Sequence, residues 1–406
     1  MSRSAPRART VPASRRRPGY LAAAAVFAAG MAGTTLPTPL YGLYRDELGF
    51  SELTVTLVFA TYAIGVILTL LLAGNHSDRA GRRPVLLCAL AFAAASAVCF
   101  LLEDGLPLLY AGRLLSGFSA GLLSGAGTVT VLELAPAGRR SRAGFAATAA
   151  NMGGLGCGPL LAGLLAEYAP WPLTLPFLVH LALLAVAAAV VLALPEPVGG
   201  ARAGARLEPQ GLYVPPQVRG VFAPAALAAF AGFSLLGLFT AVAPSFLAET
   251  LGEKNLAVSG AVVFAVFLAS TAGQACTGRF RPRAALPLGC LVLVAGLLLV
   301  GTSLWVKSLP LLVLGGACGG AGQGLAFRAG LTAVGDAAPA AHRAATVSSF
   351  FVVAYAGISL PVIGVGALTV WLGLRDAGLV FTVCVTVLAA FTGAWLARTP
   401  APRDGG

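Results

Sequence analysis

Long apolar stretches, interrupted by short polar ones, run along the whole chain of 406 residues. A bilayer core about 30 Å thick is crossed by a helix of about 20 apolar residues, since each residue adds about 1.5 Å. We expect each stretch of this length to be a transmembrane helix. Twelve spans are predicted, at residues 19–40, 53–73, 84–102, 107–132, 143–166, 173–195, 220–244, 256–277, 285–306, 309–332, 346–370 and 377–397.

The composition agrees with a chain embedded in lipid. Hydrophobic residues make up 58% of the chain and charged residues only 10%, whereas soluble folds carry about a quarter charged residues. We therefore predict an all-α integral membrane protein, and not a disordered chain, a fibre or a disulfide scaffold. The seven cysteines lie inside apolar runs without C-x-x-C spacing, so we expect no metal site and no cofactor.

Positive charge is distributed unequally between the two sides of the predicted membrane. Of the 27 Lys and Arg residues, 21 lie in the tails or in loops on the side of the membrane that holds the N-terminal tail. Four lie on the opposite side: Arg45, Lys254, Lys307 and Arg375. Lys and Arg are enriched in cytoplasmic loops, so we expect both termini to be cytoplasmic. The net charge of +12 then reflects topology, and we expect no nucleic-acid partner. The preference for Arg over Lys, with abundant Ala and Gly, is typical of a GC-rich bacterial genome and favours the cell (inner) membrane.

A Pro-, Gly- and Arg-rich connector follows the sixth span and divides the chain into two halves of six spans each. The predicted order is a basic cytoplasmic tail at 1–18, a six-helix bundle at 19–195, a cytoplasmic linker at 196–219, a second six-helix bundle at 220–398 and a cytoplasmic tail at 399–406.

The two halves repeat each other locally. Glu133 to Arg140 reads E-L-A-P-A-G-R-R, and 203 residues later Asp336 to Arg343 reads D-A-A-P-A-A-H-R. Acid, Pro and Arg recur in register, and so do several glycines. Such a duplication is typical of transporters built from related bundles. We predict that Glu133, Arg140, Asp336 and Arg343 mark equivalent helix ends on the cytoplasmic side.

The loop between spans two and three reads G-N-H-S-D-R-A-G-R-R-P-V-L from Gly74 to Leu86. It resembles the signature loop of the major facilitator superfamily, although His76 stands where an apolar residue is usual. The resemblance implies a gating loop in which Asp78 lies near a helix N-terminus and pairs with arginines across the interface between the halves. A solvated basic loop that only fixes topology is the alternative. The implied gating residues are Gly74, Asp78, Arg79, Gly81, Arg82 and Arg83.

Spans four and five extend the resemblance. Leu109 to Gly121 reads L-Y-A-G-R-L-L-S-G-F-S-A-G, and Gly154 to Gly163 reads G-L-G-C-G-P-L-L-A-G, similar to a signature of the antiporter branches. The implied fold has two pseudo-symmetric six-helix bundles. The stripe of Gly154, Gly158, Pro159 and Gly163 lacks large side chains and predicts close approach of a neighbouring helix with a local bend. Ordinary tight packing explains the same stripe equally well.

Arg113 lies inside span four, where a charge is costly and usually faces a cavity or a partner. Its duplicate position holds Gly316. The alternative is that Arg113 snorkels to the outer face. We predict a substrate and coupling cavity formed by Arg113, Asn151, Gln323 and Tyr355, to which Phe233 and Phe239 could add aromatic surface. A polar residue in a span is just as often a hydrogen-bonding contact between helices.

No Asp or Glu lies in the interior of a predicted span. Many proton-coupled members of the superfamily place an acid in the first or fourth helix, so here the proton would be carried by Asp78, Glu133 or His180. A buried, hydrogen-bonded histidine is the more ordinary interpretation of His180.

Together these features predict a secondary active transporter that exports a small hydrophobic or drug-like molecule by alternating access. We expect protons to be the coupling ion, and we expect a monomer in the lipid bilayer. A facilitator or importer of a sugar-like solute is the alternative, although the spans offer few Asn, Gln or acidic side chains. A membrane-embedded enzyme or receptor is a remote alternative, because the chain has three His and no acid within the bilayer.

Overall fold

The computed structural model of the protein describes residues 19–73, 77, 80–102, 104–136, 138–196 and 211–398. The predicted tails, residues 197–210 of the predicted linker, and Gly74, Asp78 and Arg79 of the predicted gating loop lie outside this part. Within the described residues the fold is all-α and contains no strand. Twelve helical segments there are long and apolar enough to cross a membrane, which confirms the predicted number of spans.

The first half provides six of these spans. Its helices are α1 (Tyr20–Thr35), α2 (Tyr41–Leu48), α3 (Glu52–Ala73), α5 (Arg82–Leu101), α6 (Leu106–Leu122), α7 (Thr128–Glu133), α8 (Arg140–Tyr168) and α9 (Leu175–Ala193). A 3-10 turn, η1 (Thr38–Leu40), joins α1 to α2, so the first span continues to Leu48 instead of ending near residue 40. A π-helical turn, η2 (Leu123–Gly127), joins α6 to α7 within the fourth span.

The second half provides the other six spans. Its elements are η3 (Pro216–Val218), α10 (Arg219–Ala241), α11 (Ala243–Ser245), η4 (Phe246–Thr250), α12 (Leu256–Cys276), η5 (Thr277–Arg279), α13 (Pro282–Val306), α14 (Leu309–Ala337), α15 (Arg343–Leu372) and α16 (Leu374–Arg398). Helices α14 and α15 begin 203 residues after α6 and α8. This is the offset of the sequence repeat, so the duplication extends to the helix boundaries.

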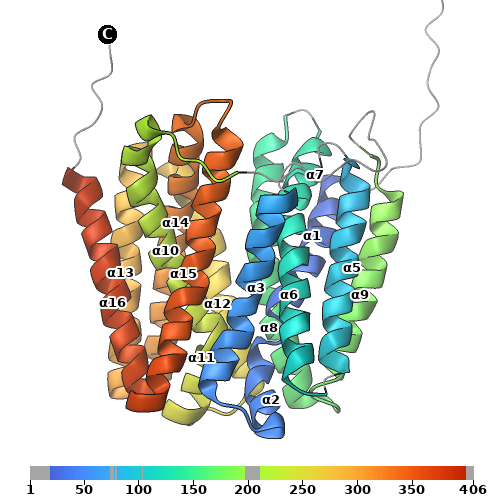
Figure 1. Ribbon diagram of the computed structural model, residues 1–406, viewed down its shortest axis with the longest axis vertical. Helices are drawn as coiled ribbons and strands as arrows, with labels where there is room; N and C mark the ends of the chain where they lie inside the picture. The colour runs from blue at the N-terminus through green and yellow to red at the C-terminus, as the bar shows by residue number, and fades with distance from the viewer. Residues whose placement is uncertain are drawn as a thin grey trace, which may run out of the picture.

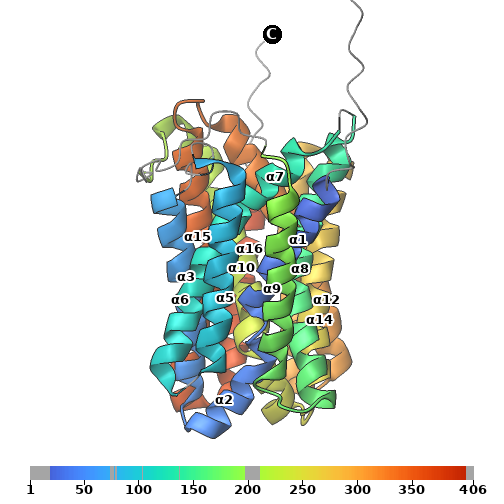
Figure 2. The ribbon, with the colours of Figure 1, turned by 90° about the vertical axis from the view of Figure 1, so that its right-hand side faces the viewer.

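The two bundles stand side by side, with their helices along the long axis of the molecule (Figure 1). Helix pairs α8 with α12 and α3 with α15 join them. We call the end where α1 begins and α16 ends the terminal end, and the opposite end, which carries α2, the distal end (Figures 1 and 2).

Candidate functional site

A cavity of about 690 Å³ lies between the two bundles. Its walls come from α1, α3, α6, η2, α7 and α8 on one side and from α10, α12, α14 and α15 on the other. Small-molecule sites have volumes of about 300–1,000 Å³. Lining residues near the terminal end are exposed, as Phe145 is (56%), whereas deep ones such as Tyr62 (4%) are buried. The cavity therefore opens toward the terminal end and is closed toward the distal end.

Aromatic side chains provide much of the cavity wall. The Tyr355 ring lies 6.1 Å from that of Tyr62 and 5.8 Å from that of Phe233, centroid to centroid, so ring contacts join the two bundles. Phe239 does not line the cavity, because its ring is buried inside the second bundle against Gly316, the duplicate position of Arg113. The aromatic lining residues are Phe59, Tyr62, Phe145, Phe233, Phe267, Phe327, Phe351 and Tyr355.

Arg113 lines the buried end of this cavity and is only 1% exposed. Its Nη1 donates to the Thr34 carbonyl oxygen (2.5 Å), and its Nη2 lies 3.4 Å from the Phe59 carbonyl oxygen. The guanidinium carbon is 4.9 Å from the centroid of the Tyr62 ring, a cation–π geometry. These contacts hold the guanidinium at the cavity, so Arg113 does not snorkel to the distal face.

The other predicted cavity residues divide into two groups. Tyr355 and Asn151 line the cavity, and the Asn151 Oδ1 is buried without a hydrogen-bond partner in the described structure. Gln323 does not line it. Its Oε1 accepts a hydrogen bond from Ser270 Oγ (2.6 Å), and its side chain packs against Gly232. Position 323 faces α10 and α12 inside the second bundle, so the prediction for Gln323 was wrong.

Several polar lining residues were not predicted, and two of them carry an amide or a charged group. Gln274 comes from α12, and Arg328 comes from α14, where its Nη1 donates to Thr148 Oγ1 across the interface (3.2 Å). Arg328 lies near the end of the predicted span 309–332, where sequence alone does not show whether it faces a cavity. Only its position opposite α8 brings it to the cavity.

The small-residue stripe of α8 contacts two different helices. A Cβ added at Gly154 or Gly158 would collide with the backbone of α1, and one at Gly163 would collide with the backbone at Leu256 of α12. Pro159 removes the N–H that would bind the Leu155 carbonyl oxygen, and Thr35 Oγ1 of α1 donates to that oxygen instead (2.5 Å). The stripe thus brings α8 close to α1 within its own bundle and close to α12 across the interface.

The described part of the gating loop contacts its own bundle. Gly81 precedes α5 at φ +97°, a value that glycine adopts readily. The backbone N–H groups of Arg82 and Arg83 donate to the Glu196 carboxylate, both at 2.9 Å, which places an anion at the N-terminus of α5. The Arg82 guanidinium binds Glu133 through two hydrogen bonds, of 3.0 and 2.9 Å.

The predicted helix-end residues have different surroundings in the two halves. Glu133 pairs with Arg82 across its own bundle, whereas Arg140 begins α8 and lines the open end of the cavity. Asp336 stands at the end of α14, and Arg343 begins α15. The four residues therefore do mark equivalent ends of equivalent helices, all at the terminal end.

A charge cluster that was not predicted lies at the distal end. Arg45 Nη1 donates to Glu52 Oε2 (2.8 Å) and to Glu249 Oε1 (2.7 Å), and Ser245 Oγ donates to Glu52 Oε2 (3.1 Å). Arg45 and Glu52 belong to the first half, and Ser245 and Glu249 to the second. We call these four residues the distal cluster. The sequence gives no signal that these four positions meet, so only the fold reveals that they form a cluster.

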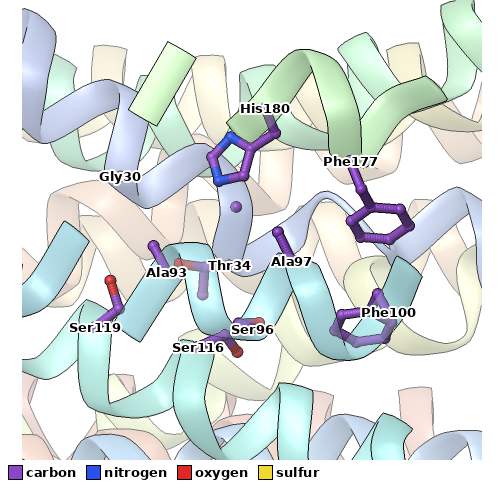
Figure 3. A pocket seen from close by; sticks show the side chains of 11 residues that line it. Gly30, Thr34, Ala93, Ser96, Ala97, Phe100, Ser116, Ser119, Phe177 and His180 are labelled. Atoms are coloured by element: carbon purple, nitrogen blue, oxygen red, sulfur yellow. The ribbon is translucent and has the colours of Figure 1, made fainter. Parts of the chain in front are cut away.

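His180 lies in a much smaller pocket, of about 10 Å³, inside the first bundle (Figure 3). This space is close to the smallest that holds one water molecule. Within the described structure, neither ring nitrogen of His180 has a hydrogen-bond partner, and neither does Ser119 Oγ. No described protein group therefore supplies the hydrogen bond that is expected of a core histidine. Thr34 lines both this pocket and the large cavity, so it separates His180 from the cavity.

Comparison with protein families gives a match over much of the chain. The family model described as Major Facilitator Superfamily matches residues 21–300. A tetracycline resistance protein, class D, from Salmonella ordonez is 36% identical over 124 residues, which are 30% of each chain. The multidrug resistance protein MdtL of Escherichia coli O139:H28 is 40% identical over 85 residues, covering 20% of this chain and 22% of that protein. The matches thus span about a third or less of the length of these curated relatives.

Solved structures show the same fold. A bacterial homologue of the human lysosomal transporter Spinster, in an inward-facing and occupied conformation, has a TM-score of 0.67 at 16% identity, covering 94% of this chain and 96% of that one. The human organic anion transporter MFSD10 (TETRAN) has a TM-score of 0.63 at 18% identity, covering 92% and 98%. At these identities the likeness concerns the fold alone.

Proposed function

The chain belongs to the Major Facilitator Superfamily, and we propose that this transporter exports small hydrophobic or drug-like molecules by alternating access. The observation that carries the proposal is the aromatic cavity between the bundles, open at one end only. Such a wall suits apolar molecules of varied shape, because stacking and burial need no fixed hydrogen-bond pattern. The relatives named for tetracycline and multidrug resistance support this substrate class.

A sugar-like substrate fits this cavity less well. Sugars are bound through many hydrogen bonds, and among the described lining residues only Asn151 and Gln274 carry amide side chains. No described lining residue is an acid. The hydroxyl groups of the lining Ser, Thr and Tyr residues suit a few polar substituents on an otherwise apolar molecule.

We propose that the terminal end is cytoplasmic in a bacterial cell membrane. The described positive residues gather there, including Arg140, Arg219, Arg281 and Arg343, whereas the distal end carries Arg45, Lys254, Lys307 and Arg375. With this orientation the cavity is open to the cytoplasm, where an exporter collects its substrate. The cavity lies within one chain, which supports a functional monomer.

Alternating access requires the distal end to open while the terminal end closes. At the distal end the bundles meet through the distal cluster and through close backbone contact at Gly163. At the terminal end the described residues of the gating loop bind within the first bundle. We propose that this loop engages the second bundle only when the terminal end closes.

We propose that a proton exchanged through His180 couples transport to the proton gradient. The imidazole is buried without a partner, and the described residues that face it from α1, α5 and α6 include no acid and no other titratable group. Thr34, which lines this pocket, is bound at its carbonyl oxygen by the positively charged Arg113. A charged imidazole would have no anionic partner among these described residues, so the neutral form is favoured in this conformation. That is the state expected after proton release.

Flux into everted membrane vesicles tests export. With a proton gradient, acidic inside, a panel of lipophilic compounds and sugars would be compared, with and without a protonophore. We expect accumulation of at least one lipophilic compound that the protonophore abolishes. Accumulation of sugars alone, or flux of the lipophilic compounds that does not depend on the proton gradient, would contradict the proposal.

The coupling role of His180 has a matched control in His342, which lies at the terminal end against the Tyr213 ring (4.9 Å). His180→Gln keeps a polar side chain but cannot take up the proton, so gradient-driven flux should disappear while downhill flux remains. His342→Gln should keep both. If His180→Gln still concentrates the compound, the proton is carried elsewhere.

A further inference from the structure

All the charged residues that line the described part of the cavity are positive. Arg113 lies at its buried end, and Arg140 and Arg328 lie near its mouth. None of the described lining residues is Asp or Glu. The cavity therefore has an apolar, aromatic wall, with positive charge both at its buried end and at its mouth.

The charge on Arg113 is not compensated by an acid. None of the ion pairs of the described structure involves Arg113, and its Nε is buried without a hydrogen-bond partner. A guanidinium remains protonated in proteins. Carbonyl oxygens and aromatic rings stabilise it only in part, because a buried charge without a counter-ion is costly. The described residues thus provide no anionic group at the deep end of the cavity.

We propose that the preferred substrates are aromatic amphipathic anions, such as carboxylates or sulfonates, whose acidic group binds Arg113. This inference rests on the proposed function only in taking the cavity as the substrate site. The planar fork of Arg113 suits a carboxylate or a sulfonate. Phe59 and Tyr62, which already lie against the guanidinium, would hold the attached ring.

Other charge states of the substrate fit less well. A lipophilic cation of the same shape would meet three arginines and no described acid, and repulsion is strong in a poorly hydrated cavity. A neutral molecule would leave Arg113 without its counter-ion. Arg140 and Arg328, which are exposed near the mouth, would attract an anion from solution and raise its rate of entry.

A purely structural role for Arg113 makes a different prediction. Thr34 is near the C-terminal end of α1, where carbonyl oxygens lack intrahelical partners, and Arg113 binds its carbonyl oxygen. A capping role needs a hydrogen-bond donor but no net charge. Arg113→Gln keeps a donor and loses the charge, whereas Arg113→Lys keeps the charge, so the two variants separate capping from anion binding.

Binding to the purified protein in lipid nanodiscs tests the proposal. The probes are naphthalene-2-carboxylate, 2-naphthylmethanol and 2-naphthylmethylammonium, which share one ring system and differ in charge. We expect the carboxylate to bind at least about tenfold more tightly than the other two probes. In Arg113→Gln this preference should fall to about twofold or less while the alcohol binds as before, and Arg113→Lys should retain part of it.

Arg375 provides the matched control. It also binds carbonyl oxygens, those of Leu304 and Trp305, and lies over an aromatic ring, that of Trp305 (5.2 Å), but at the distal end and away from the cavity. Arg375→Gln should leave the anion preference unchanged. Equal or tighter binding of the ammonium probe, no measurable preference for the carboxylate, or a preference that survives in Arg113→Gln would each overturn the proposal.

The test is independent of transport direction and of coupling. Anion-selective binding without gradient-driven export would overturn the proposed export and leave the inference standing. Export of cationic or neutral compounds by a protein that shows no anion preference would overturn the inference and leave the proposed export standing.

Discussion

The two ends of the interface between the bundles are built from different contacts. At the distal end, ionic and hydroxyl groups of the distal cluster bind across the interface, and Gly163 and Gly366 let helices approach the backbone at Leu256 and the side chain of Thr56. At the terminal end, an exposed hydrogen bond joins Arg328 to Thr148. Arg140, which also lines the mouth of the cavity, brings a second positive charge to that end.

This difference shows what keeps each end in its present state. The distal end is closed because glycine allows helices to touch and because opposite charges lie within 3 Å of each other. At the terminal end the described charged residues that line the cavity, Arg140 and Arg328, are both positive and repel each other, so closure there needs an additional partner. An anionic substrate held between Arg113 and the mouth would supply part of that attraction. Changes at the distal end should therefore have larger effects than changes at the terminal end.

The largest effect is expected for Gly163→Leu. The new side chain would collide with the backbone at Leu256, at a cost of about 1–3 kcal/mol against the closed distal end. Initial flux of a transported compound in vesicles should fall about tenfold or more. Gly153→Leu is the control on the same helix, because nothing lies within 4 Å of a Cβ added there. Equal flux in the two variants would show that close contact with α12 is not needed.

A smaller effect is expected for Glu52→Gln, which removes the charge between Arg45 and Ser245. The Glu52 side chain is only 11% exposed, and the change leaves Arg45 with one anionic partner fewer in a partly buried place, where losing a partner is costly. We expect the distal end to open about fivefold more often. A cysteine at the buried lining position 240, in a variant without native cysteines, would report this by labelling from outside intact cells. Glu47→Gln, an exposed change on α2, should not raise the labelling rate.

The pair of Arg82 and Glu133 should affect stability more than access. Both residues belong to the first bundle, and Glu133 is 34% exposed in its side chain, so Glu133→Gln should cost about 1 kcal/mol. The melting temperature of the purified protein should fall by about 2–4 °C, with labelling at position 240 unchanged. A change in labelling would instead place this pair in the gate.

The smallest effect is expected for Thr148→Val at the terminal end. It removes the oxygen that accepts from Arg328, but the contact is exposed and water can replace it. Flux and labelling should change by less than about twofold. A loss as large as that of Glu52→Gln would mean that the two ends are held with similar strength.

Much of the fold could be predicted from sequence, because lipid requires every span to be long, apolar and helical. The repeat at Glu133 and Asp336 located the equivalent helix ends, because acids, prolines and arginines concentrate where helices leave the membrane. Span ends were predicted less well. The first span continues to Leu48 through η1, and periodicity gave no signal for the π-helical turn η2.

The candidate site was predicted only in part. Arg113 was identified because a charge inside a span is costly wherever the helix packs, whereas Gln323 and Phe239 turned out to face their own bundle. A polar or aromatic residue in a span can face lipid, a neighbouring helix or a cavity. The sequence pattern around the residue is the same in each case.

The sequence by itself determined that this chain crosses a membrane in two related bundles, because hydrophobic length and charge distribution act locally along the chain. Only the tertiary structure decided which end is open, that Arg45, Glu52, Ser245 and Glu249 meet, and that the cavity combines aromatic walls with arginines and no described acid. The physical reason is that helix rotation and the contacts between bundles are set by packing among residues far apart in the chain. No single segment contains that information.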